Sequence, residues 1–299
     1  MTLDECENVF RAVRQAGSIS EACFHLTRLF DSYELVSIEL KRGETVYWRA
    51  RSAGERQWPN ISDMAYPPAE IAKCGRLNDI GDPCFYAATR EETALWEIEA
   101  QAEQHVQLAG FRPLHETPIR IAVVGELFHV YKTGYLRLVG TDPDGSMRRL
   151  INDFEPNYAK RLLYIDSFLA DLLADPKAAE SNYMLSRAIA GMIYRKGELD
   201  GIMFPSVRDH LGMNLALRAS AFDEKMQAVC CFHGKVKRKR SYGFIDYDVL
   251  REIERIDDNG APVWIEAPSE KIRRFFNLSR KEFEAASGGA TFGASADKR

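Results

Sequence analysis

Strand patterns and helix patterns follow one another in this chain without the regular strand–helix–strand alternation that builds a parallel sheet. Two strong amphipathic helical patterns, at 158–175 and 183–196, stand among short strand-like runs. Those runs cover residues 36–40, 45–51, 83–88, 105–111, 119–124, 201–204, 215–219 and 227–232, and the first two flank a turn at Arg42-Gly43. We therefore expect an α+β fold with a mixed sheet core and helices.

The N-terminal part predicts a pair of helices. Val9 and Val13 recur at helical spacing, and Ser18 followed by Glu21 has the spacing of a capping box for a second helix. We expect residues 1–34 to form a helical segment that packs on the main domain or on a partner.

Composition and charge exclude several classes of protein. A formal net charge of -4 over 299 residues does not favour a nucleic-acid binder. The run from Lys235 to Arg240 has five basic residues in six, which leaves open a polyanion contact or a solvated hairpin. The six histidines lack metal-ligand spacing, so no metal site is predicted. Neither a dinucleotide-binding glycine motif nor a P-loop is present.

The cysteines and the N-terminus predict a cytoplasmic protein. None of the six cysteines forms a C-x-x-C pair, and the simplest interpretation is six reduced thiols. The first residues lack the basic and apolar regions of a signal peptide, and no apolar run is long enough to span a membrane.

Three blocks carry candidate chemistry. The first is Y-W-R-A-R at 47–51, the second runs from G-R-L-N at 75–78 through P-C-F-Y-A-A at 83–88 to T-A-L-W-E at 93–97, and the third is D-G-I-M-F-P-S at 200–206 with G-M-N at 212–214. Thr89 followed by Glu92 predicts the start of a helix that continues to about Ala100. Alone, each block has an ordinary structural explanation: a solvated strand-end arginine, a turn, a core tyrosine, a surface glutamate.

In this order the blocks resemble the RES-domain family, toxins of bacterial toxin–antitoxin modules. The resemblance covers roughly residues 46–220, with a long unmatched middle at about 112–181 that we interpret as a helical insertion. It implies an ADP-ribosyltransferase-like catalytic domain at 35–286. The Gly-, Ala- and Ser-rich residues 287–299 predict a disordered tail.

The resemblance also assigns roles to six residues. Three are assigned as catalytic and three as substrate-binding; they are Glu97, Arg49 and Ser206, and Arg76, Tyr86 and Asn214. Arg51, on the same strand face, is the alternative first arginine. Family members degrade NAD by hydrolysis or phosphorolysis, or ADP-ribosylate a target, and are blocked by a separately encoded Xre-type antitoxin.

The chemistry suits these residue types. Cleavage of the nicotinamide–ribose bond passes through an oxocarbenium-like state, which a carboxylate such as Glu97 stabilises. Arginine forks bind a pyrophosphate, and the Tyr86 ring can stack on nicotinamide. NAD is the substrate, so no separate cofactor is implied.

We carry three hypotheses from the sequence. The first is an NAD glycohydrolase or phosphorylase that depletes NAD as a toxin, the second a protein ADP-ribosyltransferase, and the third a non-enzymatic binding module on a RES scaffold. The sequence leaves open the acceptor of ADP-ribose, the identity of the antitoxin and whether the chain forms a homo-oligomer.

Overall fold

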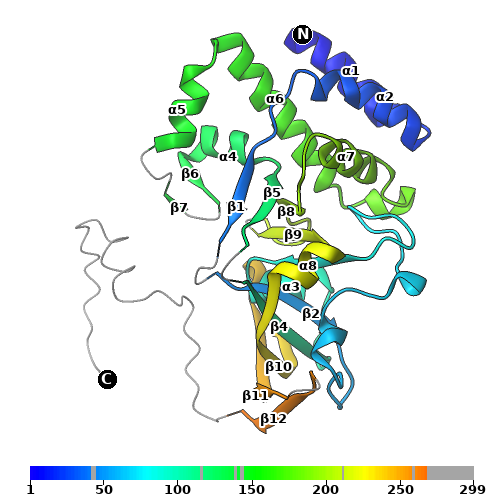
Figure 1. Cartoon of the computed structure of the whole chain (residues 1–299), viewed down its shortest axis with the longest axis vertical. Coiled ribbons are helices and arrows are strands. Elements are labelled where there is room, and N and C mark those ends of the chain that lie inside the picture. The colour runs from blue at the N-terminus through cyan, green and yellow to red at the C-terminus, as the bar shows by residue number, and fades with distance from the viewer. Residues whose placement is uncertain are drawn as a thin grey trace. The chain divides into compact units, whose positions relative to one another are not determined.

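A large mixed sheet with helices packed on it forms the body of the protein (Figure 1), so the expected α+β fold is confirmed. The structure, a computed structural model, describes residues 1–41, 45–114, 117–137, 140–141, 145–210, 212–257 and 260–267. A compact unit runs from Met1 to Glu266. The predicted turn at Arg42-Gly43 and the predicted tail from Ser287 lie outside the described residues.

Over the described residues the sheet has ten strands in the order β1-β5-β8-β9-β3-β2-β4-β10-β11-β12. All neighbours are antiparallel except β5 and β8. The strands are β1 (Ser37–Leu40), β2 (Tyr47–Ser52), β3 (Cys84–Ala88), β4 (His105–Pro113), β5 (Ile119–Val123), β8 (Gly201–Pro205), β9 (Met213–Arg218), β10 (Met226–Lys239), β11 (Ile245–Ile256) and β12 (Pro262–Glu266), and a separate two-stranded sheet joins β6 (Tyr135–Leu136) and β7 (Gly140–Thr141).

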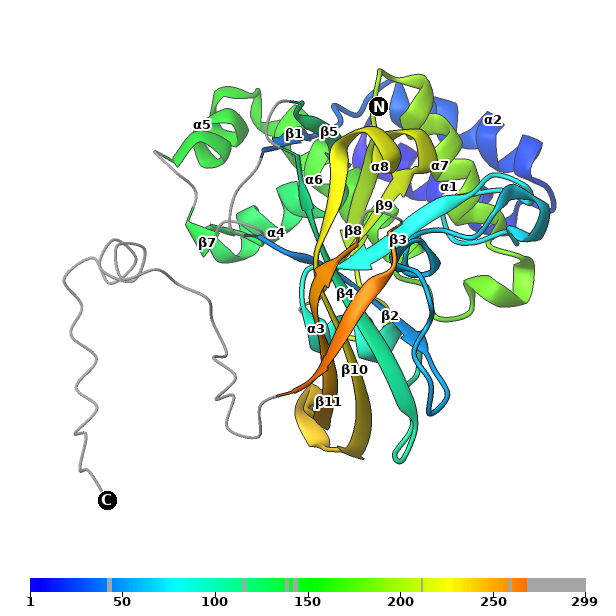
Figure 2. The same cartoon turned by 60° about the horizontal axis from the view of Figure 1, so that its bottom comes forward.

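The first two strands do not form the hairpin that their spacing suggests. β1 pairs with β5, whereas β2 pairs with β4 and β3. Among the described residues, β2 and β3 share a single register pair, Trp48 with Ala88. The ten strands therefore divide at this point into two halves, and Figure 2 shows β2 and β3 leaving it in different directions.

Helices cover one face of the half of the sheet that contains β5, β8, β9 and β3 (Figure 1). The α-helices are α1 (Leu3–Gln15), α2 (Ile19–Phe30), α3 (Glu91–Glu97), α4 (Glu126–Thr133), α5 (Ser146–Asp153), α6 (Pro156–Leu173), α7 (Met184–Arg195) and α8 (Ala219–Lys225), and the short 3₁₀ turns are Ile61–Met64, Ala69–Ile71, Ala178–Ser181 and Ser241–Gly243. α6 and α7 match the two helical patterns of the sequence, because their apolar faces bury residues three and four apart.

The N-terminal helices share a core with α6 and α7. Phe10 of α1 stacks on Phe168 of α6, with ring centroids 3.9 Å apart. The Tyr33 hydroxyl donates to the buried Asp166 carboxylate of α6 at 2.6 Å. The helical pair thus packs on the rest of the chain through buried contacts, while its predicted separation at residue 34 stays a prediction.

The basic run lies in the hairpin of β10 and β11. Three of its cations pair with carboxylates across or beside the hairpin, Lys235 with Glu103 at 2.7 Å, Lys237 with Asp248 at 2.7 Å and Arg240 with Asp246 at 2.5 Å. Most of the positive charge of the run is therefore locally balanced.

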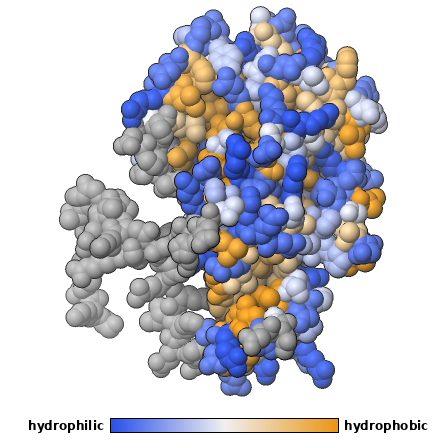
Figure 3. Space-filling model, viewed as in Figure 1, coloured by the Kyte–Doolittle hydropathy of each residue, from blue (hydrophilic) through white to orange (hydrophobic). Residues whose placement is uncertain are grey.

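The face shown in Figure 3 is mostly hydrophilic, with apolar areas between the hydrophilic ones. One such area lies at the lower end of the view, where β10, β11 and β12 are. Among the described residues of these strands, the exposed large apolar side chains are Val229, Leu250 and Ile265. In the described ranges no helix has both the length and the hydropathy to cross a membrane.

Candidate active site

Glu97 is the last residue of α3, a helix that packs on the junction between the two halves of the sheet. Thr93, Ala94 and Leu95 form its buried face. The helix is shorter than the sequence predicts, because Glu99 has a positive φ of 52° and turns the chain away. The N-cap of α3 is Arg90 and not Thr89 as predicted. The Thr89 backbone N–H donates to the Met213 carbonyl of β9 at 3.0 Å, which ties the start of the helix to the sheet.

Two side chains hold the Glu97 carboxylate. The Ser206 hydroxyl and the Asn214 Nδ2 each donate to Glu97 Oε1, both at 2.6 Å. In the described part of the chain Oε2 has no hydrogen-bond partner, and Glu97 is only half-buried. One carboxylate oxygen is thus fixed by the protein while the other is open to a ligand.

Ser206 is itself fixed by the turn that follows β8. Its Oγ accepts the backbone N–H groups of Arg208 at 3.1 Å and Asp209 at 3.0 Å, so its proton is directed at Glu97. The Asp209 carboxylate accepts from the buried Thr93 hydroxyl of α3 at 2.5 Å. The turn after β8 and the helix of Glu97 are therefore joined twice.

Asn214 reaches Glu97 from β9. It lies opposite Ala88 in the register of β3 and β9, beside the point where the sheet divides. Asn214 is 7% exposed, and its Oδ1 is buried with no partner among the described residues. A buried amide oxygen without a partner is unusual in a folded protein.

Tyr86 stands on the same sheet face as Asn214, because Tyr86 pairs with Ala216 and side chains two residues apart on a strand share a face. Its hydroxyl accepts the Leu77 N–H at 2.8 Å and donates to Asn78 Oδ1 at 2.9 Å. Burial raises the pKa of Tyr86 well above its usual value, so the phenol stays neutral. The ring is therefore held in one place by the loop that carries Arg76.

Asn78 is not among the six residues to which the sequence assigns a role, although it is the last residue of the G-R-L-N block. Its Nδ2 donates to the carbonyls of Lys73, Asp79 and Asp82 at 2.9–3.0 Å, and its Oδ1 accepts from Tyr86. This buried amide shapes the loop at 73–82.

Arg76 extends from this loop towards the end of α6. Its Nη1 donates to the carbonyls of Leu173 at 2.9 Å and Asp175 at 3.1 Å, and its guanidinium lies 5.4 Å from the Tyr183 ring. Burial lowers the pKa of Arg76, and the negative charge of Glu97 is among the groups that oppose this shift.

Arg49 lies on the other face of the sheet. Because Trp48 pairs with Ala88, the next residue of β2 points the opposite way. Its Nη1 donates to the Tyr86 carbonyl at 2.8 Å and its guanidinium lies 5.9 Å from the Phe85 ring. Burial, together with the charge of Arg51, lowers the pKa of Arg49 to about 10. Within the described residues it makes no hydrogen bond or ion pair with Glu97.

Arg51, the alternative first arginine, also lies away from Glu97. Its guanidinium lies 4.1 Å from the Trp58 ring and donates to the Asp63 carbonyl. The structure therefore brings Glu97, Ser206 and Asn214 into contact and places Tyr86 on the same sheet face as Asn214. Arg76 binds the end of α6, and Arg49 binds the Tyr86 carbonyl from the other face. The roles of all six residues stay predictions.

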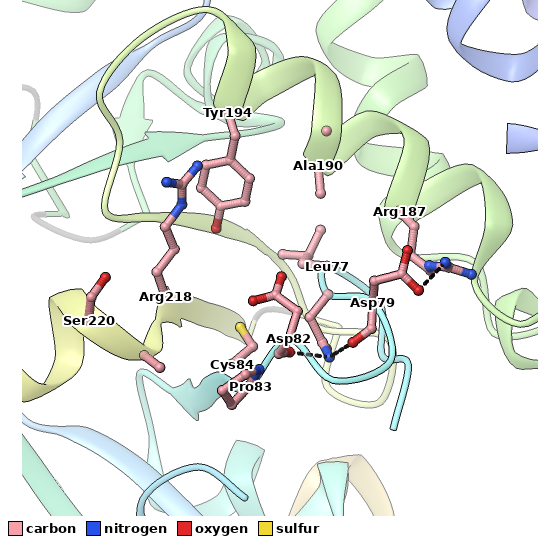
Figure 4. A pocket seen from close by; sticks show the side chains of 13 residues that line it. Leu77, Asp79, Asp82, Pro83, Cys84, Arg187, Ala190, Tyr194, Arg218 and Ser220 are labelled. Carbon is pink, nitrogen blue, oxygen red and sulfur yellow. Dashed lines mark hydrogen bonds and ion pairs between the residues drawn. The ribbon is translucent and has the colours of Figure 1, made fainter. Parts of the chain in front are cut away.

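A cavity of about 540 Å³ lies near this group but does not include Glu97 (Figure 4). Residues of α7, of the loop at 77–82 and of the adjoining ends of β3 and β9 line it. Arg218 lies against the Tyr194 ring, 4.0 Å from its centroid, and Arg187 pairs with Asp79 at 2.5 Å. Asn78 lines the cavity and also accepts the hydrogen bond of the Tyr86 hydroxyl, whereas neither Tyr86 nor Glu97 is among the lining residues.

Comparison with protein-family models matches residues 46–233 to the family described as RES domain, which is more than half of the 299-residue chain. The match begins where the sequence resemblance begins and includes all six candidate residues. No curated protein matches the chain.

Proposed function

Because the chain belongs to the RES-domain family, we propose that it consumes NAD by cleaving the bond between nicotinamide and ribose, as a glycohydrolase or phosphorylase. The observation that carries this proposal is the Glu97 carboxylate, with Oε1 held by Ser206 and Asn214 and Oε2 open. A carboxylate held in this way is suited to stabilise positive charge that develops on a ribose ring.

In the proposed reaction, Glu97, Arg76 and Tyr86 each contact a different part of NAD. The bond between ribose C1′ and the nicotinamide nitrogen breaks, and its electron pair leaves with nicotinamide. Glu97 Oε2 faces the ribose as C1′ becomes positive, and water or phosphate oxygen then bonds to C1′ and releases a proton to solvent. Arg76 supplies positive charge for the pyrophosphate, and the ring of Tyr86 borders the nicotinamide. NAD is consumed as the substrate, and no further cofactor takes part.

Purified protein mixed with NAD tests the proposal. We expect free nicotinamide, and ADP-ribose or its 1-phosphate, by mass spectrometry. Glu97→Gln should lower the rate by about 10²–10³-fold or more, because it removes the charge that faces the ribose. Glu92→Gln, on the same helix but paired with Arg90, is the matched control and should keep the wild-type rate. If the ADP-ribose of labelled NAD becomes attached to protein and is not released as free product, the chain is an ADP-ribosyltransferase. If no NAD is consumed, the non-enzymatic binding module is the hypothesis that stands.

The proposed activity also predicts an effect on growing cells. Expression in bacteria should arrest growth by draining NAD, and Glu97→Gln should restore it. The proposed partner is an Xre-type antitoxin that covers the site. Growth arrest that persists in the Glu97→Gln variant would contradict NAD depletion as the cause.

A further inference from the structure

The cavity between α7 and the adjoining ends of β3 and β9 is lined by four charged side chains, and only two of them pair with each other. Arg187 of α7 binds Asp79 at 2.5 Å, so these two charges are balanced. Asp82 and Arg218 also line the cavity, but in the described part of the chain neither of them makes an ion pair. In the view of Figure 4, Asp82 lies between Arg218 and the Arg187–Asp79 pair.

The backbone of Asp82 is fixed, whereas its carboxylate is open to a ligand. The Asp82 N–H donates to the Asp79 carbonyl at 3.2 Å, and the Asp82 carbonyl accepts from the Nδ2 of the buried Asn78 at 2.9 Å. Among the described residues the carboxylate has no hydrogen-bond partner, and Asp82 is exposed. The loop therefore presents a negative charge to the cavity from a fixed position.

Arg218 is held by an aromatic ring and not by an anion. It pairs with Cys84 in the register of β9 and β3, so it stands beside the strand that begins two residues after Asp82. Its guanidinium lies 4.0 Å from the centroid of the Tyr194 ring of α7. A guanidinium that lies over a ring keeps the N–H groups at its edge for a carboxylate in its own plane. The cavity thus holds one positive and one negative group, each without a charged partner.

The remaining lining leaves space and offers apolar contact. Ala190 and Gly191 are the small residues of α7 at the cavity, and Leu77 and Pro83 add apolar surface from the loop. The volume of about 540 Å³ is in the range of small-molecule sites. An anion alone would bring its charge towards that of Asp82, and a cation alone would leave Arg218 without a partner. The lining therefore suits a ligand that carries one charge of each sign and an apolar part.

We propose that this cavity binds a free α-amino acid with an apolar side chain. The Arg218 guanidinium donates to the α-carboxylate, the Asp82 carboxylate accepts from the α-ammonium group, and the apolar side chain of the ligand lies against Leu77. The site is separate from the proposed NAD site, because neither Glu97 nor Tyr86 lines the cavity.

Calorimetric titration of the whole chain with L-leucine, isocaproate and isoamylamine tests the proposal. Isocaproate lacks the ammonium group of leucine, and isoamylamine lacks its carboxylate. For the wild type, we expect each analogue to bind roughly tenfold or more weakly than leucine, because each loses one charge-assisted contact. Arg218→Gln should bind leucine and isoamylamine alike, and Asp82→Asn should bind leucine and isocaproate alike, since the group that distinguishes them has lost its partner.

Two variants serve as controls. Arg28→Gln removes an exposed arginine that does not line the cavity, and should bind leucine with the wild-type affinity. Glu97→Gln should also bind leucine as the wild type does, so the result does not depend on whether the chain cleaves NAD. Melting curves without ligand show that each variant is folded.

Three outcomes would overturn the proposal. No detectable binding of leucine at millimolar concentration would mean that the cavity is not an amino-acid site. Equal binding of isocaproate and leucine to the wild type would show an anion site in which Asp82 takes no part. If Asp82→Asn and Arg218→Gln both bind leucine with the wild-type affinity, leucine binds elsewhere on the chain.

Discussion

Gly212 closes the turn that carries Ser206, and its lack of a side chain is a requirement of packing. Its carbonyl accepts the Ser206 N–H at 2.9 Å. A Cβ at this position would come within 2.7 Å of Thr93 Cγ2 and 2.8 Å of Asp209 Oδ2. The turn and α3 therefore pack so closely that there is no room for a side chain at position 212.

We expect Gly212→Ala to push the turn away from α3 and to move Ser206 relative to Glu97. A displacement of this kind costs on the order of 10²-fold in rate, and overpacking costs about 1–3 kcal/mol of stability. Nicotinamide release and thermal melting measure both effects. Gly197→Ala is the control, because a Cβ there meets nothing within 4 Å. Equal behaviour of the two variants would show that the turn tolerates the shift.

The sequence grouped three residues that the structure brings into contact, but it did not indicate how the six candidate side chains are oriented. Glu97, Ser206 and Asn214 were assigned from short blocks in a fixed order, and they lie in contact although 109 and 117 positions separate the bonded pairs. Periodicity is local and says nothing about contacts over such distances. For the same reason the sequence did not indicate that Arg49 binds the Tyr86 carbonyl from the opposite face of the sheet.

Among the elements, α6 and α7 were the most predictable, because each carries several turns of one apolar stripe. Two other elements were not predictable: α8 has only seven residues, and β11, although long, buries few side chains and so has no clear pattern. The pairing of β1 with β5 also escaped prediction, because it joins residues 79 to 85 positions apart, from Leu40 with Ile119 to Ser37 with Ala122, and does not depend on a turn signal.

The hairpin of β10 and β11 braces the helix of Glu97. Trp96 Nε1 donates to the Gly243 carbonyl at the hairpin turn at 2.8 Å, and the Lys239 ammonium lies 4.4 Å from the Trp96 ring. Trp96→Phe removes the hydrogen bond and weakens the cation–π contact, so we expect a loss of about 1 kcal/mol and a several-fold slower release of nicotinamide. Denaturant unfolding and the NAD assay measure these changes. Tyr242→Ala, at a side chain 98% exposed, should change neither.

At the scale of the whole molecule, the N-terminal helices share a core with α6, so we expect them to unfold together with the rest of the chain. Phe10 is buried against Phe168, whereas Phe24 of α2 is 70% exposed. Phe10→Ala should cost about 3–5 kcal/mol of global stability, and Phe24→Ala should stay within about 0.5 kcal/mol of the wild type. Calorimetry should show a single transition that moves to lower temperature for Phe10→Ala. A separate early transition, with the main one unmoved, would mean that the helical pair unfolds independently.

Two buried carboxylates make the stability of the whole molecule depend on pH. Asp166 accepts hydrogen bonds from Tyr33, Gly125 and Phe128, so its oxygens are satisfied. Glu126 is 4% exposed, and while its Oε1 accepts the Arg137 N–H at 2.7 Å, its Oε2 is buried with no partner in the described ranges. Burial raises the pKa of both groups, and for Glu126 it outweighs the opposing effect of Arg137.

Glu126→Gln should therefore flatten the pH dependence of unfolding. The folded protein holds the Glu126 proton more tightly than the unfolded chain does, so the stabilisation by this group is complete below its ordinary pKa of 4.5 and is lost as pH rises through the raised value. The amide keeps an acceptor for Arg137 and carries no charge to bury. Melting temperatures of both proteins from pH 4 to 8 should lie close together at the acid end and diverge above it, with Glu126→Gln the more stable. Parallel curves would show that Glu126 titrates alike in the folded and unfolded states, and that the desolvation of this carboxylate does not limit stability.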